Sequence, residues 1–275
     1  MTVQKLAAFT SDGKGGNPAG VMIADTLPPA EEMQAIAARI GFSETVFATR
    51  EGEGFRARYF APEAEVPFCG HATIALGAAL GAAFGEGVYA LALNAADISV
   101  TAYTDGNAWG ARLVSPGTSW RPVPEDILAE ARALFGLHPD DLDSAVAPAL
   151  TNGGAEHLLL PLDNAQLLRA MAYDFDAGAD FMQVHGLVTV NLIWRQATAR
   201  IHARNAFAGH GVYEDPATGA AAAALAGYLR DAGLQDGPFE VIQGTDMGMP
   251  SRLQVTPRPG AGAPVEVAGL TRVMG

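Results

Sequence analysis

The sequence predicts an α+β fold with two pseudo-symmetric domains, each a mixed β-sheet rolled around a central apolar helix. Three observations support this prediction. Short runs rich in β-branched and aromatic residues recur along the chain, as they do in strand-rich folds. Two segments, 72–83 and 219–229, are apolar on every side of the helix that they would form, so each belongs inside a domain. The sequence around the first of these segments also repeats around the second.

The N-terminal half is expected to contain several strands and two helices. The first helix is expected to begin after Pro28-Pro29 and to end at Gly41, because proline favours the first turn of a helix and glycine favours its end. The expected elements, in order, are strands at 3–9 and 20–24 around a Gly-rich turn at 11–17, the helix before Gly41, strands at 45–48 and 55–60, and the central helix at 72–83.

A linker is expected at 115–124, because proline and glycine interrupt regular structure. This linker suggests a first domain of residues 1–115 plus 262–275 and a second domain of residues 116–261. The expected elements after 124 are an amphipathic helix at 125–135, strands at 158–162, 187–194 and 199–203, the apolar helix at 219–229, and strands at 239–242, 253–256 and 265–267.

The repeat is centred on Gly70 and Gly219, which lie 149 residues apart. Each glycine has proline three residues before it, alanine two and five residues after it, and leucine six and ten residues after it. The agreement of the proline, glycine and leucine positions indicates a duplicated half. By this symmetry, the starts of the two apolar helices are expected to face each other across a cleft.

Composition narrows the possible partners. The 275-residue chain has 17 Lys+Arg and 30 Asp+Glu, which gives a formal net charge of −13. This acidic balance argues against nucleic acid and anionic membranes as partners, because both require clustered Lys and Arg. Hydrophobic residues make up 49% of the chain, which excludes a disordered protein.

Cysteine content and apolar length narrow the class of protein further. The single cysteine, Cys69, excludes an internal disulfide and a Cys-rich zinc site. The longest apolar stretch, 72–84, is too short to cross a bilayer. The N-terminus has no signal-peptide pattern, so a cytoplasmic protein is expected.

The two apolar helices are expected to bind an anion at their starts. A helix N-terminus supplies unpaired backbone N–H groups and a positive dipole end. A small carboxylate is therefore the expected substrate, held by backbone donors although the protein is acidic. Gly70 and Gly219 would allow it to approach the backbone closely. The alternative is that both glycines serve only as turn residues.

Three titratable residues adjoin these helix starts, namely Glu44, His71 and Asp215. Two carboxylates and an imidazole around one cleft suit the removal and return of a proton at carbon. Each residue also has a structural alternative. Glu44 could be an exposed residue of an edge strand, His71 could be a structural residue of its helix, and Asp215 could cap the second helix.

Cys69 offers a thiol as a further base. Racemases that work without a cofactor use two thiols, but the position equivalent to Cys69 in the second half holds Thr218. The alternative role for Cys69 is that of a small buried hydrophobic residue. The remaining histidines show no ligand-like spacing and no nucleotide-binding motif is present, so neither a metal nor a bound nucleotide is expected.

Several short motifs occur in a fixed order along nearly the whole chain. They are Gly16-Asn17-Pro18, Ser43-Glu44-Thr45-Val46-Phe47, Arg58-Tyr59-Phe60-Ala61-Pro62, Pro67-Phe68-Cys69-Gly70-His71-Ala72-Thr73, Glu214-Asp215-Pro216-Ala217-Thr218-Gly219, and Gln243-Gly244 with Met247-Gly248 and Pro250-Ser251. In this combination the chain resembles the phenazine-biosynthesis isomerase (PhzF-like) family, which has the diaminopimelate-epimerase-like fold.

The resemblance implies a homodimer without a metal or organic cofactor, and an active site between the two domains. In the phenazine enzyme the substrate is trans-2,3-dihydro-3-hydroxyanthranilate, in which a proton moves from C3 to C1. Carried over by motif, Glu44 shuttles this proton, and His71 and Asp215 are its active-site partners. The substrate contacts that the same motifs imply are Asn17, Gly70, Gly219, Ala220 and Gly248.

The chain departs from the family pattern at positions that concern substrate recognition. Many members have serine where this chain has Ala220, a basic residue where it has Met249, and Phe-x-Pro where it has Ala206-Phe207-Ala208. The missing hydroxyl at position 220 removes one potential hydrogen bond, worth about 1 kcal/mol. These changes leave the proton-transfer residues in place.

Three functions remain open on the sequence. The first is an isomerase that moves a proton on a small cyclic or unsaturated carboxylate, with Glu44 as general acid and base. The second is a one-thiol racemase, epimerase or dehydratase that uses Cys69. The third is a non-catalytic relative that binds a metabolite or a protein partner.

Overall fold

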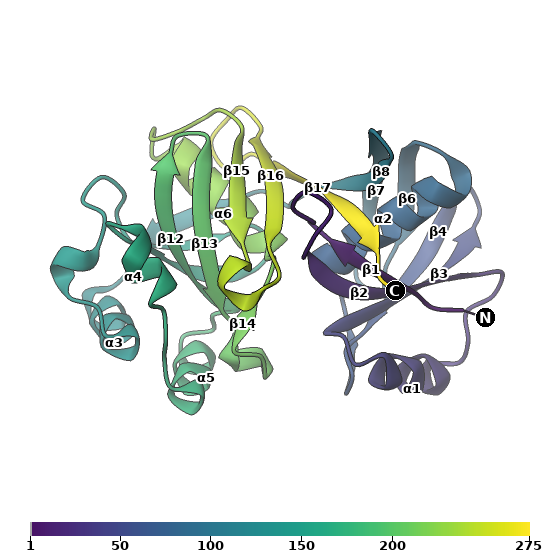
Figure 1. The fold of residues 1–275 in the computed structure, drawn as a ribbon, viewed down its shortest axis with the longest axis horizontal. Helices are drawn as coiled ribbons and strands as arrows, with labels where there is room; N and C mark the ends of the chain where they lie inside the picture. Colours follow the sequence, from purple (N-terminus) through teal and green to yellow (C-terminus); the bar gives the residue numbers. More distant parts are fainter. Residues whose placement is uncertain (1) are drawn as a thin grey trace. The chain divides into compact units, whose positions relative to one another are not determined.

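The computed structural model describes residues 2–275, which divide into two compact units (Figure 1). The first unit runs to Val114 and includes Ala268–Gly275, and the second is Ser115–Val267. The sequence prediction had the C-terminal segment rejoin the first domain at residue 262. The structure places this return later, because the carbonyls of Gly262 and Val265 accept hydrogen bonds from the backbone N–H groups of Thr118 and Ser115 within the second unit.

The strands of the first unit form a closed ring in the order β1, β2, β3, β4, β6, β7, β8 and β17, with β17 pairing again with β1. The pairs β2–β3 and β4–β6 are parallel. A short strand, β5, pairs with β4. The bounds are β1 (Gln4–Ala8), β2 (Asn17–Ala24), β3 (Glu44–Glu51), β4 (Gly54–Phe60), β5 (Glu65–Val66), β6 (Gly87–Ala92), β7 (Asp97–Asp105), β8 (Ala108–Val114) and β17 (Val265–Val273).

The apolar segment expected to form the central helix of the first domain is α2 (Gly70–Phe84), and it packs against β1, β2, β3, β6, β7 and β8. Every residue from His71 to Gly81 is buried, which explains why the segment has no polar side. Small residues in α2 let the strands approach the helix closely. A Cβ atom added at Gly77 would lie 2.5 Å from Val100 Cγ2. The predicted arrangement of a sheet rolled around a helix is therefore confirmed for this unit.

Helix α1 (Ala30–Ile40) packs on the other side of the sheet, against β3 and β4. It buries Met33, Ile36 and Ala37 in a cluster with residues of β2, β3 and β4. The helix ends at Gly41, whose φ of 72° is left-handed, as the sequence predicted.

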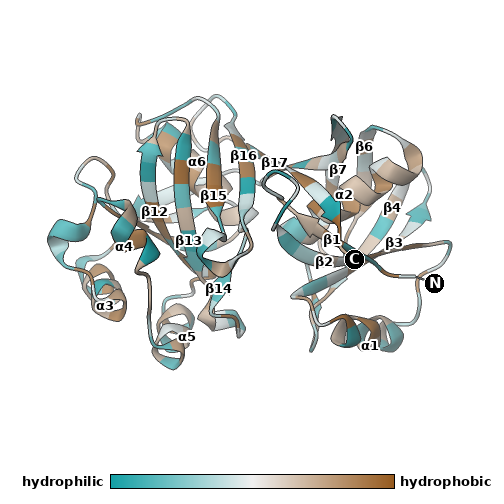
Figure 2. Cartoon of the chain, viewed as in Figure 1, coloured by the Kyte–Doolittle hydropathy of each residue, from teal (hydrophilic) through white to brown (hydrophobic). Residues whose placement is uncertain are grey.

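The second unit repeats this plan in the order β9, β10, β11, β12, β13, β15 and β16. The pairs β11–β12 and β13–β15 are parallel, and the short β14 pairs with β13. Buried residues alternate with half-buried or exposed ones along β15 and β16, as expected for strands with one buried face, and Figure 2 shows the hydropathy of the strands. The bounds are β9 (Ser119–Pro122), β10 (Ala149–Asn152), β11 (Glu156–Pro161), β12 (Thr189–Ala197), β13 (Arg200–Ala206), β14 (Glu214–Asp215), β15 (Phe239–Gln243) and β16 (Ser251–Pro257).

The central helix of the second unit is α6 (Gly219–Asp231), which packs against β9, β10, β11 and β16. A second apolar cluster fills the space between the sheet and the outer helices. These outer helices are α3 (Glu125–Phe135), α4 (Ala165–Arg169) and α5 (Phe175–Val184), and short 3₁₀ turns occur at η1 (Pro139–Asp141), η2 (Ala208–His210) and η3 (Thr245–Met247).

Several elements differ from the sequence prediction. The segment expected to be a linker, 115–124, contains β9, which pairs with β10. The elements absent from the expected set are strands β5, β6, β7, β8, β10 and β14 and helices α4 and α5. Most residues of β6 and β7 are exposed or half-buried, and in β7 polar Thr, Ser and Asp residues interrupt the apolar ones.

An Arg–Glu pair occurs at the same place in both units. In the first, Arg58 of β4 donates to both carboxylate oxygens of Glu65 on β5, at 2.8 and 2.6 Å. In the second, Arg204 of β13 donates to both oxygens of Glu214 on β14, at 3.0 and 2.5 Å. In each pair Nε and Nη2 are the donors. This repeated pair supports the duplication that the sequence predicted from Gly70 and Gly219.

A buried histidine lies in the sheet of the second unit. His157 on β11 is fully buried, and its Nδ1 lies 2.8 Å from Thr189 Oγ1. The Thr189 hydroxyl donates its hydrogen to Asn205 Oδ1 at 2.8 Å, so it accepts from His157, which carries its proton on Nδ1. Burial lowers the pKa of His157 to about 3. The imidazole is therefore neutral across the physiological range.

The lowered pKa of His157 predicts a loss of stability in acid. Below a pH of about 6.5 the unfolded chain protonates this histidine while the folded protein does not, so the free energy of unfolding falls by up to about 1.4 kcal/mol per pH unit until the pH nears 3. Urea unfolding of the wild type and of His157→Asn over this range measures the effect. The carboxylates titrate in both proteins and cancel in the comparison. Equal slopes in the two proteins would contradict the prediction.

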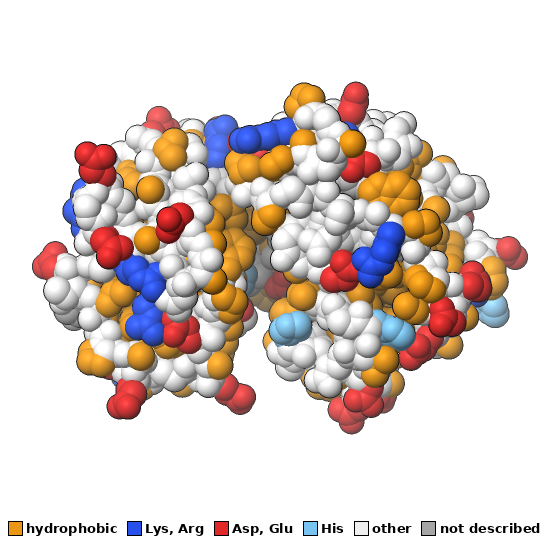
Figure 3. Space-filling model, turned by 180° about the vertical axis from the view of Figure 1, so that it is seen from behind, with side chains coloured by type: hydrophobic (Ala, Val, Ile, Leu, Met, Phe, Trp, Pro, Cys, Tyr) orange, Lys and Arg blue, Asp and Glu red, His pale blue; other side chains and the backbone are white. Residues whose placement is uncertain are grey.

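None of the helices within residues 2–275 has both the length and the apolar character needed to cross a bilayer. Acidic side chains are spread over the face of the molecule in Figure 3, whereas Lys and Arg occur there in a few small groups. This distribution agrees with the net charge of −13.

Candidate active site

Glu44 is the first residue of β3 and is largely shielded from solvent. Strand β3 lies between β2 and β4, and Glu44 pairs with Ala19 of β2. The Glu44 side chain is only 18% exposed. The structural alternative, an exposed residue of an edge strand, is therefore wrong.

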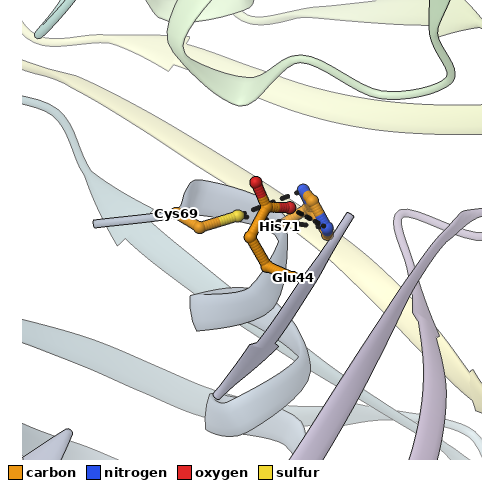
Figure 4. A group of neighbouring side chains, drawn as sticks. All are labelled: Glu44, Cys69 and His71. Atoms are coloured by element: carbon orange, nitrogen blue, oxygen red, sulfur yellow. Dashed lines mark hydrogen bonds and ion pairs between the residues drawn. The ribbon is translucent and has the colours of Figure 1, made fainter. Parts of the chain in front are cut away.

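His71 lies in the first turn of α2, and its buried imidazole contacts residues on both sides. Its Nε2 atom lies 3.3 Å from Glu44 Oε2 and 3.4 Å from Ser43 Oγ. Its Nδ1 atom lies 3.3 Å from Cys69 Sγ. Figure 4 shows the three side chains of Glu44, Cys69 and His71 pointing toward one another from β3 and from the start of α2. The sequence prediction placed Glu44 and His71 together, and the structure brings them into contact.

Cys69 occupies the N-cap position of α2 and is held by a buried hydrogen-bond chain. Its carbonyl accepts hydrogen bonds from the backbone N–H of Thr73, at 3.0 Å, and from the Thr73 hydroxyl, at 2.7 Å. The hydroxyl of Tyr59 lies 2.8 Å from Thr73 Oγ1, and it donates because the threonine hydrogen is already used. Burial raises the pKa of Tyr59, so the phenol stays protonated. This chain fixes the position of the thiol next to His71.

One oxygen of the Glu44 carboxylate is left without a hydrogen bond. Glu44 Oε2 is buried, and among the described residues none donates a hydrogen bond to it. The distance of 3.3 Å between Glu44 Oε2 and His71 Nε2 is that of an ion pair, but the two groups are not aligned as a hydrogen bond requires. A buried carboxylate oxygen in this state is available to accept a proton or to bind a cation.

Both central helices begin without a side-chain cap from the residue at the N-cap. Cys69 precedes α2 and Thr218 precedes α6, and neither side chain accepts a hydrogen bond from its own helix. The N-cap side chains therefore do not take up the backbone N–H groups of the first turns, which begin at Gly70 and Gly219 and are the kind of donors that a carboxylate site needs. Neither glycine has a left-handed φ, so neither is required as a turn residue.

Asp215 lies in the second unit at the end of β14 and does not cap α6. Its Oδ2 atom accepts a hydrogen bond of 2.5 Å from the Thr218 hydroxyl. Gln243 Nε2 donates to the Asp215 carbonyl at 2.6 Å and to Thr218 Oγ1 at 3.0 Å, and Gln243 Oε1 accepts from Thr218 N at 3.2 Å. Asp215 is thus fixed by a network before the helix, and the alternative that it is the N-cap residue of α6 is wrong, because Thr218 holds that position.

The remaining predicted site residues are divided between the two units. Asn17, in the first unit, begins β2 and is buried. Ala220, in the second unit, occupies the place in α6 that His71 occupies in α2. Gly248 ends η3 with a left-handed φ of 71°. That these residues and Asp215 share one cleft with Glu44 and His71 stays a prediction.

Four residues with contacts in these networks were given no role on the sequence. Ser43 contacts His71, and Gln243 holds Asp215 and Thr218. Tyr59 and Thr73 form the chain that holds Cys69. All four stand inside the family motifs, so their neighbours gave a signal. Their contacts depend on strand and helix packing, which a motif does not specify.

Comparison with known proteins gives a consistent result. A family model described as "Phenazine biosynthesis-like protein" (PhzC-PhzF) matches residues 6–272. An uncharacterized isomerase of Deinococcus radiodurans is 33% identical over 270 residues, covering 91% of this chain and 85% of that protein. The trans-2,3-dihydro-3-hydroxyanthranilate isomerase of Pseudomonas fluorescens is 31% identical over 254 residues, covering 90% and 86%. The structure of a PhzF-family protein of Bacillus anthracis matches with a TM-score of 0.84 at 24% identity, covering 99% and 96%, and this match concerns the fold alone.

Proposed function

The chain belongs to the PhzC-PhzF family of phenazine biosynthesis-like proteins and is an isomerase, and from this premise we propose that it moves a proton between carbons of a small cyclic or unsaturated carboxylate, with Glu44 as the general acid and base. The observation that carries the proposal is the contact between Glu44 and His71. A carboxylate and an imidazole lie 3.3 Å apart and are shielded from solvent. Such a pair suits proton transfer at carbon.

In the proposed step, Glu44 begins as a carboxylate and takes a proton from a substrate carbon next to a conjugated system. The electron pair of the broken C–H bond moves into that system. Glu44, now a carboxylic acid, returns the proton to a second carbon, and the double bonds shift accordingly. The enzyme regains its starting state and the substrate keeps its atoms, so no external oxidant or reductant is needed. The absence of a hydrogen bond to Glu44 Oε2 among the described residues supports its availability as the proton acceptor.

His71 is proposed to orient the Glu44 carboxylate and to stabilise it in its charged form. Its Nε2 atom is within reach of both Glu44 Oε2 and Ser43 Oγ. The imidazole can therefore keep its contact with the Ser43 hydroxyl while the Glu44 carboxylate gains and loses the proton. The first-turn N–H groups of α2 and α6 are proposed to hold the substrate carboxylate. The proposal assigns Asp215 as a further active-site partner of Glu44. The substrate contacts that it assigns are Asn17, Gly70, Gly219, Ala220 and Gly248.

The experiment that tests this function is an absorbance time course with trans-2,3-dihydro-3-hydroxyanthranilate, together with mass spectrometry of candidate carboxylates incubated with the enzyme in D₂O. Loss of the diene absorbance would assign this substrate. Deuterium incorporation into another carboxylate alone would keep the reaction class and change the substrate. Binding without solvent exchange would favour a non-catalytic role in metabolite binding.

A one-thiol reaction is a second candidate, because Cys69 Sγ lies 3.3 Å from His71 Nδ1. An imidazole next to a thiol promotes the thiolate, which is the reactive form. Cys69→Ala distinguishes the two mechanisms better than alkylation does, because an alkyl group on Sγ would crowd His71. Proton exchange that survives in Cys69→Ala and is lost in Glu44→Gln would exclude the thiol mechanism.

The homodimer expected from the resemblance and the cytoplasmic location expected from the N-terminal sequence stay predictions. Size-exclusion chromatography with light scattering tests the first of them. A monomer at all protein concentrations would remove the homodimer from the proposal.

A further inference from the structure

We propose that a cavity on the outer face of the sheet of the second unit binds a small amino acid in its zwitterionic form, such as glycine or alanine. The cavity has a volume of about 110 Å³ and is lined by residues of α4, of strands β12, β13 and β15, and of η3. The side chains that define its chemistry are an arginine, an aspartate, a histidine and a tryptophan, namely Arg169, Asp246, His202 and Trp194. This binding does not rest on the function proposed above, because Glu44 and His71 belong to the first unit.

Trp194 of β12 and His202 of β13 give the cavity an aromatic surface. The two residues are paired across their strands, and their ring centroids lie 5.2 Å apart. Trp194 packs against the apolar cluster between the sheet and the outer helices, so this face of the sheet is the one turned away from α6. Ile242 of β15, which pairs with His202, adds an aliphatic side chain. These residues suit the carbon atoms of a ligand, and the face of an indole ring also attracts an ammonium group.

Two opposite charges line the same cavity. Arg169 ends α4 and Asp246 lies in η3. Both charges act on His202, which places them near its ring. Within the part of the chain that the structure describes, neither side chain forms an ion pair or a hydrogen bond. A guanidinium binds a carboxylate and an aspartate binds an ammonium group, so both ends of a zwitterion find a partner here.

His202 adds an uncharged acceptor. Its Nε2 atom lies 2.8 Å from Gln196 Oε1, and because that oxygen only accepts, the imidazole carries its proton on Nε2. Burial of the ring and the nearby charges of Arg200 and Arg169 lower the pKa of His202. The charge of Asp246 raises this pKa, but the lowering prevails. The ring is therefore neutral at physiological pH, and its Nδ1 atom can accept a hydrogen bond from an ammonium group.

The volume of the cavity limits the size of the ligand. A water molecule takes up about 30 Å³ in the liquid, so the cavity of about 110 Å³ holds the equivalent of about four waters. Pockets for drug-sized ligands span about 300–1,000 Å³. The cavity thus suits glycine or alanine and is too small for an aromatic amino acid. The net charge of −13 disfavours a simple anion, whereas a zwitterion adds no net charge.

An NMR titration of the full-length protein with L-alanine tests the site, because each tryptophan indole N–H gives its own resonance. The resonance of Trp194 is assigned by its loss in Trp194→Phe. It should shift saturably at millimolar L-alanine, while those of Trp109 and Trp120, which do not line the cavity, should keep their positions. Propionate lacks the ammonium group and ethylamine lacks the carboxylate. Each should bind at least about 10-fold more weakly than alanine, the effect of losing one hydrogen bond to a charged group.

Arg169→Gln and Asp246→Asn should each weaken alanine binding by at least about 10-fold for the same reason. The matched control is Arg39→Gln, because Arg39 is likewise exposed in the last turn of a helix but belongs to α1 in the first unit. This variant should bind alanine as the wild type does, and thermal unfolding confirms that each variant is folded.

Three results would overturn the proposal. They are a wild type without a saturable shift of Trp194, propionate that binds as tightly as alanine, and an unchanged affinity for alanine in Arg169→Gln. None of these measurements depends on turnover of a substrate, so failure of the amino-acid site and failure of the proposed function are distinguishable.

Discussion

Glu44→Gln is expected to lower kcat for proton transfer at carbon by about 10²–10⁴-fold, the usual contribution of a general acid or base. Glutamine keeps the size of the side chain and can still contact His71, but it cannot take and return a proton. Substrate binding should change little, because backbone N–H groups of the helix starts are proposed to hold the carboxylate. Absorbance kinetics and deuterium incorporation in D₂O measure the effect.

A matched control for this substitution is Glu130→Gln. Glu130 is also paired with a histidine, His185, but it lies on α3 and is exposed. This variant should retain wild-type kcat. If Glu44→Gln kept most of its activity while Cys69→Ala lost it, Glu44 would not be the proton carrier and the thiol mechanism would replace it.

Arg204→Met is expected to lower the free energy of unfolding by about 3–5 kcal/mol, the cost of leaving one member of a buried ion pair alone. Glu214 is only 3% exposed, and Arg204 donates to both of its oxygens. Arg204 Nη1 also donates to the carbonyl of Arg169 at 3.0 Å. Burial opposes the charge on Arg204, but the hydrogen bond and the charge of Glu214 outweigh it and raise the pKa of Arg204. Chemical denaturation measures the loss.

The repeated pair in the first unit provides the comparison. Arg58 and Glu65 have the same bidentate geometry, but their side chains are 23% and 27% exposed. Arg58→Met should therefore cost about 1 kcal/mol or less, since solvent can take the place of the lost partner. Equal losses in the two variants would show that burial does not determine the strength of these pairs.

The sequence predicted the features of the fold that depend on composition over a long segment. Both central helices are apolar on all sides, and their shared proline, glycine and leucine positions indicated the duplication. Strand β7 (Asp97–Asp105) was not predicted, because Thr, Ser and Asp occupy much of it and only Val100 and Ala102 are buried. The strand is held by backbone pairing with β6 and β8 rather than by the burial of its own side chains.

The candidate site was predicted where a motif places a residue at a helix start or a strand end. Glu44 and His71 were found this way. The contact of Cys69 with His71 and the network of Gln243 could not be predicted, because they depend on rotamers and on the packing of separate elements. Asp215 was weighed as a cap on local spacing, and the structure shows that Thr218 and Gln243 use its carboxylate and carbonyl instead.

Strand β17 has a consequence for synthesis on the ribosome. The part of this strand from Ala268 onward pairs with β1 through Leu6 and Val273, and β17 also pairs with β8. A nascent chain that has reached Val114 therefore has two open sheet edges, which are prone to association with other chains. The whole second unit must be translated, at about 5–20 residues per second, before the closing strand emerges. The half of the protein that is made first is thus completed last.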